Sequence, residues 1–264
     1  EINLTVPVNS KDEIGELAAS FNKLITVSKE YVVIADTIAN GDYTPVINVR
    51  SESDMLGNAL INMKDNLLRL SKENETRTWL MTGNSEMNDI MRGEKEVHEL
   101  AQGIISKLSS YLDAQVGAIY VAENGHLDLS GSYAFQQRKG NSNRVQQGQG
   151  LVGQAALEKK PIVFSNIPED YVQVSSALGS SKPNNIIVYP FLFDGNVRGV
   201  IELGTVREFS RIDMQLLEVL SNNIGIAFNS AQSRAKLKEL LEETQRQAEE
   251  LEAQQEELRQ INEE

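Results

Sequence analysis

The sequence contains no cysteine and only two histidines, His98 and His126. The lack of cysteine excludes disulfide bonds, thiolate metal sites, thiol nucleophiles and thioether-linked chromophores. Two histidines argue against a histidine-rich metal site and against a Ser-His-Asp triad. We therefore predict no metal site and no catalytic residue in this sequence.

Long apolar runs and clusters of basic residues are missing too. The longest apolar run, from Ile186 to Phe193, spans eight residues, which is too short to cross a bilayer. The 25 Lys and Arg residues are outnumbered by 38 Asp and Glu residues, which gives a net charge of −13. Nucleic-acid binding relies on clustered Lys and Arg, so this balance argues against a nucleic-acid partner.

What the sequence does contain fits a folded chain. Apolar residues make up 40% and charged residues 24% of the 264 residues, as expected for a chain with a hydrophobic core. At roughly 150 residues per domain, this length allows two domains, or one domain with long helices. The sequence begins at Glu1, without an initiator methionine, and we expect it to be a segment of a longer protein.

A short pattern occurs twice, 42 residues apart. Asp12–Gly15 (Asp-Glu-Ile-Gly) matches Asp54–Gly57 (Asp-Met-Leu-Gly), and each aspartate is a suitable helix N-cap. The apolar residues that follow are three and four positions apart, so they line one stripe of a helix, as in the seam of a helix bundle. They are Ile14, Leu17, Phe21 and Leu24 in the first copy and Leu56, Leu60, Met63, Leu67 and Leu70 in the second.

A further helix is predicted before the second copy, from about Ser28 to Ala39. It ends at Asn40 and Gly41, where glycine suits the left-handed exit of a helix. Asp42 follows, and then a non-helical stretch with spaced apolar residues, 45–49, leads to the second copy.

This layout resembles the HAMP domain, a parallel four-helix bundle formed by two chains that relays signals in bacterial transmembrane receptors. The resemblance covers residues 28–70, and residues 1–27 resemble the second half of an earlier copy. An ordinary helical hairpin is the alternative, but matched helix breakers in a repeat favour the HAMP interpretation. The resemblance implies structural and relay roles for Asp12, Glu13, Gly15, Gly41, Asp42, Asp54 and Gly57.

The middle of the chain predicts an α+β domain. A helix from about Glu94 leads into a buried strand, 115–122, and Asn124-Gly125 is a strong hairpin signal before a second strand. A second hairpin is predicted around Asp194-Gly195, and a periodic helix follows over 211–231. Hairpins flanked by helices indicate an antiparallel sheet.

Gly148, Gly150 and Gly153 satisfy the G-x-G-x-x-G pattern of dinucleotide-binding proteins. That pattern requires a buried parallel strand directly before it. The preceding residues, 139–147, are polar, and the surrounding strands are paired by hairpins. We therefore reject a dinucleotide site.

The same residues fit another family. Gly148–Ala155, Pro161–Val163, Val188–Leu192 and Gly199–Leu203 occur in the order seen in GAF domains, and the resemblance extends over 95–232. GAF domains are sensor and dimerisation modules, some of which bind cyclic nucleotides, bilins, haem or small metabolites. No cofactor is evident here, although an unidentified small ligand is compatible with a pocket between the sheet and residues 164–184. The candidate pocket residues are Phe164, Tyr171, Tyr189, Phe191 and Glu202, with ordinary core packing as the alternative for the aromatics.

The C-terminal segment, 233–264, has the spacing of a coiled coil. Its candidate seam residues are separated alternately by four and three positions and flanked by Glu, Gln and Arg. This predicts a parallel dimer, with a single exposed helix as the alternative. The seam residues are Leu237, Leu241, Thr244, Ala248, Leu251, Gln255, Leu258 and Asn262.

The predicted fold class is therefore α+β: a HAMP-like parallel helical bundle, a GAF-like domain and a C-terminal parallel coiled coil, with residues 71–94 as a helical linker. This order resembles the cytoplasmic relay region of a bacterial sensor histidine kinase in the inner membrane. The resemblance implies a non-catalytic homodimer, preceded by transmembrane and input domains and followed by kinase domains. The alternative is a small-molecule-binding GAF sensor that controls a nucleotide cyclase, a diguanylate cyclase or a phosphatase.

Overall fold

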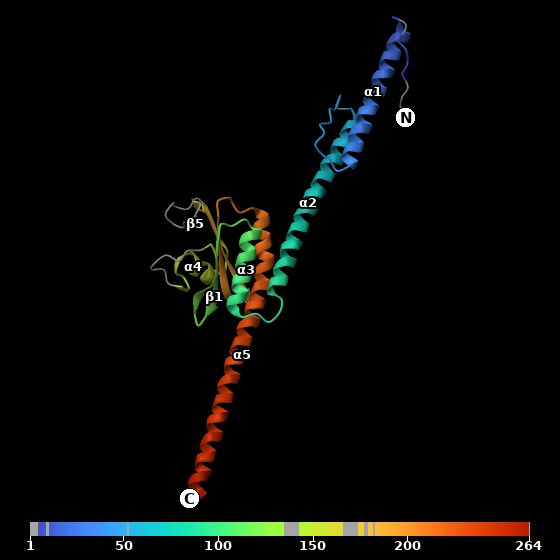
Figure 1. Ribbon diagram of the computed structural model, residues 1–264. Coiled ribbons are helices and arrows are strands. Elements are labelled where there is room, and N and C mark those ends of the chain that lie inside the picture. The colour runs from blue at the N-terminus through green and yellow to red at the C-terminus, as the bar shows by residue number, and fades with distance from the viewer. Residues whose placement is uncertain are drawn as a thin grey trace. The chain divides into compact units, whose positions relative to one another are not determined.

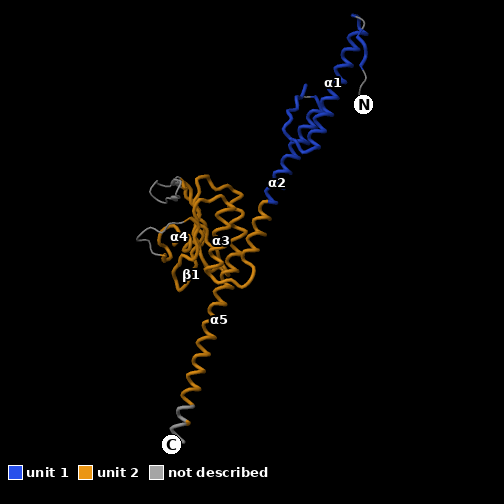
Figure 2. Tube along the Cα trace, in the orientation of Figure 1, with its two compact units in different colours: residues 1–78 blue, residues 79–264 orange. Residues whose placement is uncertain are grey.

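The structure is a computed structural model that describes residues 5–8, 11–51, 53–134, 143–165, 174–176, 179–181 and 183–263. The chain divides into two compact units, residues 1–78 and residues 79–264 (Figure 2). Within the described residues, no helix combines the length and the apolar character needed to span a bilayer.

The first unit contains helix α1 (Glu13–Ala39) and the start of helix α2 (Met55–Met91). The helix predicted to begin after Asp12 and the helix predicted from Ser28 are one continuous helix, so the expected boundary between residues 27 and 28 falls inside α1. The helix ends as predicted, because Gly41 adopts a φ of +86° directly after Asn40.

A small core holds this unit together. Val27, Tyr31 and Ile38 of α1 pack with Leu60 of α2 and with Ile47 of the connector between the helices. The connector is non-helical, as predicted, and its Ile47 is buried whereas Asn48 is exposed. Ile47, together with the partly buried Tyr43, therefore packs the connector against both helices.

The second unit is built on a six-stranded antiparallel sheet with the order β3-β2-β1-β8-β7-β4 (Figure 1). Positive φ values at Asn124 and Gly125, and at Asp194 and Gly195, form the two hairpin turns that the sequence predicts. The strands are β1 (Val116–Glu123), β2 (His126–Tyr133), β3 (Arg144–Gln146), β4 (Ile162–Ser165), β7 (Asn185–Phe193) and β8 (Asn196–Thr205), with β5 (Val174–Ser176) and β6 (Gly179–Ser181) in a separate pair.

The two faces of the sheet are covered differently. Helix α3 (Val97–Tyr111) and the beginning of helix α5 (Arg211–Glu263) pack on one face, together with the end of α2, whose Met87 is buried there. Helix α4 (Gly150–Glu158) packs on the other face through Val152, Ala155 and Ala156. We call these the helix-bundle face and the α4 face.

The end of α2 lies close to α3 and α5. A Cβ atom at Gly83 would lie 2.7 Å from Tyr111 Cε1 and 3.1 Å from Leu216 Cδ1. The ring of Trp79 lies 4.9 Å from that of Tyr111, whose hydroxyl donates to the Trp79 carbonyl. The predicted linker is therefore helical up to Met91, and its last turns belong to the core of the second unit.

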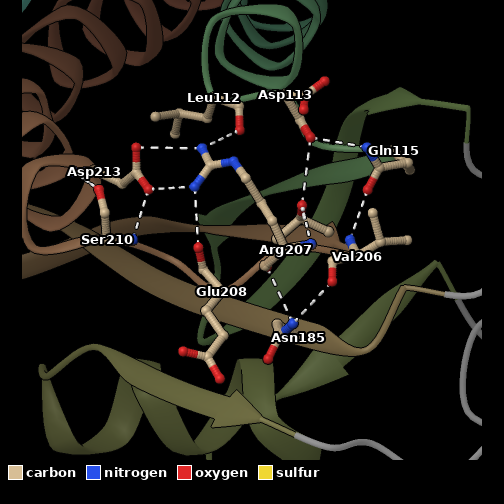
Figure 3. A network of polar contacts seen from close by, with 10 residues as sticks. Leu112, Asp113, Gln115, Asn185, Val206, Arg207, Glu208, Ser210 and Asp213 are labelled. Atoms are coloured by element: carbon tan, nitrogen blue, oxygen red, sulfur yellow. Dashed lines mark hydrogen bonds and ion pairs between the residues drawn. The ribbon is translucent and has the colours of Figure 1, made fainter.

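A buried ion pair joins the end of α3 to the start of α5 (Figure 3). Arg207 Nη1 donates to Asp213 Oδ2 at 2.6 Å, and Arg207 Nη2 donates to the carbonyl of Leu112 at 2.6 Å. Asp213, only 4% exposed, also accepts from the Ser210 N–H at 2.7 Å. Burial alone raises the pKa of Asp213, but the bonds from Arg207 and Ser210 outweigh it, so the net shift is downward.

The predicted fold class is confirmed: an antiparallel sheet with flanking helices follows an N-terminal helical region and precedes a long helix.

The contribution of the Arg207–Asp213 ion pair to stability can be tested by substitution. Arg207→Met leaves the buried Asp213 carboxylate without its cation, which we expect to lower the free energy of unfolding by about 2 to 3 kcal/mol. Breaking a fully buried pair costs about 3 to 5 kcal/mol. We expect a smaller loss here because the Arg207 side chain is 36% exposed and water replaces part of the pairing. Urea denaturation measures it. Arg211→Met, which removes an exposed cation four residues away, is the control, and equal effects of both substitutions would contradict the role of the pair.

Candidate functional site

Tyr31, Asp54 and Gly57 form a polar latch in the first unit. The Tyr31 hydroxyl donates to Asp54 Oδ2 at 2.5 Å, and the N–H of Gly57 donates to Asp54 Oδ1 at 2.9 Å. The bond to Tyr31 holds the pKa of Asp54 below its usual value, and the same bond raises the pKa of Tyr31. One carboxylate thus caps the start of α2 and ties it to α1.

Gly57 lies so close to Tyr31 and Asp54 that a side chain at this position would collide with them. A Cβ atom there would lie 2.8 Å from the Tyr31 hydroxyl oxygen and 2.9 Å from Asp54 Oδ2. Any larger residue therefore displaces one partner of the latch. Asp54 and Gly57 were predicted as functional residues, whereas Tyr31 was missed, because nothing in the local pattern links a residue 23 positions upstream to Asp54.

The exit from α1 is built by the other predicted residues of this region. Asp42 accepts hydrogen bonds from the Thr44 hydroxyl at 2.7 Å and the Thr44 N–H at 2.9 Å, which lower the pKa of Asp42. The N–H groups of Gly41 and Asp42 donate to the carbonyls of Ile38 and Thr37. These bonds fix the direction of the connector.

The first copy of the repeat is built in a similar way. Asp12 accepts from the N–H groups of Ile14 and Gly15, both at 3.2 Å, while Glu13 is exposed in the first turn of α1. Asn22 exchanges two hydrogen bonds with the backbone of Val6, at 2.9 and 2.7 Å. The sequence did not predict this role for Asn22, since a polar residue on a helix has no partner visible in the pattern.

The predicted helix stripes remain largely exposed in the described chain. Leu60 is buried in the core of the first unit and Leu67 packs against that core, but most members of the stripes lie open. The exposed members are Ile14, Leu17, Phe21, Leu24, Leu56, Met63 and Leu70 in the first unit and Leu237, Leu241 and Leu251 on α5. Thr244, Ala248 and Gln255 are exposed too, whereas the surroundings of the Leu258 and Asn262 side chains lie outside the description.

The predicted GAF pocket residues do not share one face of the sheet. Phe191 is fully buried on the helix-bundle face, where its ring stacks on Phe228 at 5.0 Å, and Tyr189 packs against the same core. Their placement in one pocket with Glu202 was wrong, because alternation along β7 turns both rings toward α3 and α5. Phe164 is exposed on β4, and Tyr171 lies outside the described residues.

Glu202 is an acidic residue in an apolar setting. It lies on β8 between Ala118 of β1 and Val188 of β7, both of which belong to the core of the α4 face. Burial raises the pKa of Glu202 to about 7. A carboxyl group that titrates near neutrality inside a sheet is a candidate for ligand contact.

Among the residues that the structure describes, no group of three or more His, Asp or Glu side chains could hold a metal ion. The arrangement therefore offers helix stripes for a protein partner and a carboxyl group for a ligand.

Comparison with known families gives two matches. The family model of the GAF domain matches residues 94–229, just over half of the chain. The chain belongs to the GAF domain family. The family model of the HAMP domain matches residues 1–26 and does not extend over the second predicted copy at 28–70. A HAMP domain followed by a GAF domain indicates a signalling sensor region, and a HAMP domain is typical of membrane-linked proteins.

Solved structures agree with the GAF fold. The GAF domain from the Acinetobacter phosphoenolpyruvate-protein phosphotransferase aligns with a TM-score of 0.50 at 14% identity, covering 60% of this chain and 97% of that chain. The GAF domain from the Coxiella burnetii phosphoenolpyruvate-protein phosphotransferase aligns with a TM-score of 0.49 at 14% identity, covering 61% and 96%.

One similar structure is an enzyme. The free methionine-R-sulfoxide reductase from Neisseria meningitidis, in complex with its substrate, gives a TM-score of 0.46 at 19% identity, covering 60% of this chain and 91% of that chain. Comparison with curated proteins gives no match. The likeness to the Acinetobacter structure, with its TM-score of 0.50 at 14% identity, concerns the fold alone.

The hydrogen bond between Tyr31 and Asp54 in the latch can be tested by a substitution at Gly57. Gly57→Ala places a methyl group against Tyr31 and Asp54, which we expect to break their hydrogen bond. The pKa of Tyr31, followed by NMR with ring-labelled tyrosine, then falls toward its ordinary value. Ala59→Ser, at an exposed position of the same helix, leaves the titration unchanged. An unaltered Tyr31 titration in Gly57→Ala would contradict the latch.

The raised pKa of Glu202 makes the stability of the GAF domain depend on pH. Because its pKa is raised in the folded state, the unfolded state loses the proton first, and the stability of the GAF domain falls as the pH rises from about 4.5 to about 7. Glu202→Gln removes this contribution, so we expect the variant to be more stable than the parent at pH 8 and nearly equal at pH 4.5. Urea denaturation at both values measures the difference. A difference that does not change with pH would contradict the raised pKa.

Proposed function

We propose that this chain is the non-catalytic relay region of a dimeric, membrane-bound two-component sensor. In this proposal, an upstream stimulus changes the packing of the HAMP helices, the GAF domain passes that change on or modifies it, and α5 delivers it to a downstream histidine kinase. The order of HAMP domain, GAF domain and long helix supports this direction.

The observation that carries the proposal is the exposed stripe on α5. From residue 235 to residue 255 every side chain of this helix is exposed, and Leu237 and Leu241 are 60% and 69% exposed. Helices in proteins owe most of their stability to the packing of an apolar face, and an isolated helix is only marginally stable in water. A second copy of α5, parallel and in register, places leucine against leucine along this seam.

The polar members of the seam fit a helix that changes its packing. Thr244 and Gln255 interrupt the leucines, and polar residues in a seam lower its stability while fixing its register. A seam that is only moderately stable exchanges between two packings at small energetic cost. The same backbone runs from these residues into the GAF core at Phe228 and Leu216, so a movement of the core is carried along the helix.

The exposed stripe of the first unit supports the same arrangement. Ile14 and Leu24 are 68% and 62% exposed on α1, as expected for helices that pair with a second chain. We assign residues 1–27 to the second half of a first HAMP unit and residues 28–70 to a second unit. The latch of Tyr31, Asp54 and Gly57 then holds the helix connection of that second unit.

Glu202 favours a second candidate, a small-molecule-binding GAF sensor. Its carboxyl group lies on the α4 face among apolar neighbours, and burial raises its pKa to about 7. A ligand with a cationic or hydrogen-bond-donating group would stabilise the ionised form. In this version the GAF domain supplies the input, and the output is a nucleotide cyclase, a diguanylate cyclase or a phosphatase.

Cysteine cross-linking tests the parallel dimer, and the lack of native cysteine makes each introduced thiol the only one. Leu241→Cys places identical residues opposite each other in a parallel, in-register seam, so we expect rapid disulfide formation between two chains. Arg246→Cys, on the outer side of the same helix, is the matched control and cross-links slowly. Equal rates for the two variants would contradict the seam.

The same variants test the relay in the longer protein. A disulfide at Leu241→Cys fixes one packing of α5, so kinase activity becomes independent of the stimulus, and reduction of the disulfide restores the response. Arg246→Cys keeps a normal response under oxidising conditions. A kinase that still responds with the Leu241→Cys disulfide in place would rule out transmission through this helix.

A further inference from the structure

A cavity of about 380 Å³ lies where α5 leaves the GAF domain. Its walls come from β1, β2 and β8, from Val97 at the start of α3, and from α5 between Gln232 and Glu239. Val121 of β1 lines it and belongs to the core of the helix-bundle face. The cavity is therefore separate from the α4 face on which Glu202 lies.

Two residues that line this cavity each carry a buried polar atom without a hydrogen-bond partner among the described residues: Arg198 Nε and Gln232 Oε1. The other end of the Gln232 amide is occupied, because Nε2 donates to the carbonyl of Ala122 at 2.8 Å. The Arg198 guanidinium lies 5.9 Å from the centre of the Phe193 ring. Buried polar groups without a partner are rare in native proteins and each is costly, so these two atoms mark where a ligand or a bound water can supply the partners.

The charges around the cavity narrow the chemistry of this ligand. Asp128 is already paired, with Arg144 at 2.9 Å and His126 at 3.0 Å, and Lys236 is paired with Glu239 at 2.7 Å. Arg198 has no such anion among the described residues. A guanidinium with a free N–H is matched by a carboxylate. The free oxygen of Gln232 is matched by a hydroxyl or amino group, and Glu123, which also lines the cavity, offers a further acceptor.

We propose that this cavity binds a small carboxylic acid that carries a hydroxyl or amino group. The ligand carboxylate accepts from Arg198 Nε, and its hydroxyl or amino group donates to Gln232 Oε1. Such a ligand bridges β8 to α5 five residues before Leu237, the first residue of the predicted seam. It holds the start of the exit helix against the sheet. This site stands on the cavity itself and does not depend on the relay function.

Titration calorimetry on the 264-residue chain tests the proposal with L-lactate and L-serine as probes. We expect saturable binding of at least one of them at or below about 10 mM, a range that modest contacts of this kind reach. Propionate has the carboxylate but no donor group, and we expect it to bind at least about tenfold more weakly. No saturable binding of either probe, or equal binding of propionate, would overturn the proposal.

Substitution of Arg198 separates a ligand contact from a structural role. Arg198→Met removes the unpaired donor, so we expect binding to be lost while the melting temperature of the ligand-free protein stays equal or rises. Lys160→Met, which removes an exposed cation from the turn after α4, leaves binding unchanged. Unaltered binding by Arg198→Met would refute the site.

Gln232→Met gives an independent readout. This variant keeps Arg198 but lacks the acceptor, so we expect it to bind the better of L-lactate and L-serine as weakly as propionate. Because the comparison is made within one variant, a partial loss of stability does not affect the ratio. Retained preference for the hydroxyl or amino group in Gln232→Met would overturn the proposed contact.

Discussion

Helix α5 buries the apolar side chains of its first turns and exposes those of its later turns along one uninterrupted backbone. Its first turns place Leu216, Leu220 and Phe228 in the core of the GAF domain. Its later turns carry leucines that nothing in the described chain covers. In the proposed dimer a second chain covers these leucines, and a change in the core reaches the seam through the helix backbone.

The junctions of the GAF domain hold this helix in place. Arg207 binds both Asp213 at the start of α5 and the carbonyl of Leu112 at the end of α3, and so it holds these two helix ends together. At the other end of the sheet, Gln232 binds the backbone of β1 through Ala122. The proposed ligand cavity lies at that second junction, where Arg234 of α5 also donates to the carbonyl of Lys95.

Local patterns predicted the features that depend on neighbouring residues. The expected positive φ angles occur at Asn124-Gly125, at Asp194-Gly195 and at Gly41. They could be predicted because Gly, Asn and Asp tolerate positive φ better than other residues do. Alternation along β7 correctly puts Phe191 and Tyr189 on one face, but it does not say which face, and both rings belong to the core under α3 and α5. The boundary predicted between residues 27 and 28 falls inside the continuous helix α1, which has no glycine or proline over residues 16–39. Contacts such as Arg207 with Leu112, 95 residues apart, have no trace in the local sequence.

The central claim is that two chains complete the exposed stripes, and light scattering across a concentration series tests it most directly. We expect a mass of twice 29.3 kDa, unchanged on dilution, because both the bundle and the seam need a second chain to bury their leucines. A stable monomer of 29.3 kDa at every concentration would contradict the relay, and it would leave the ligand sites of the GAF domain as the features that explain its function.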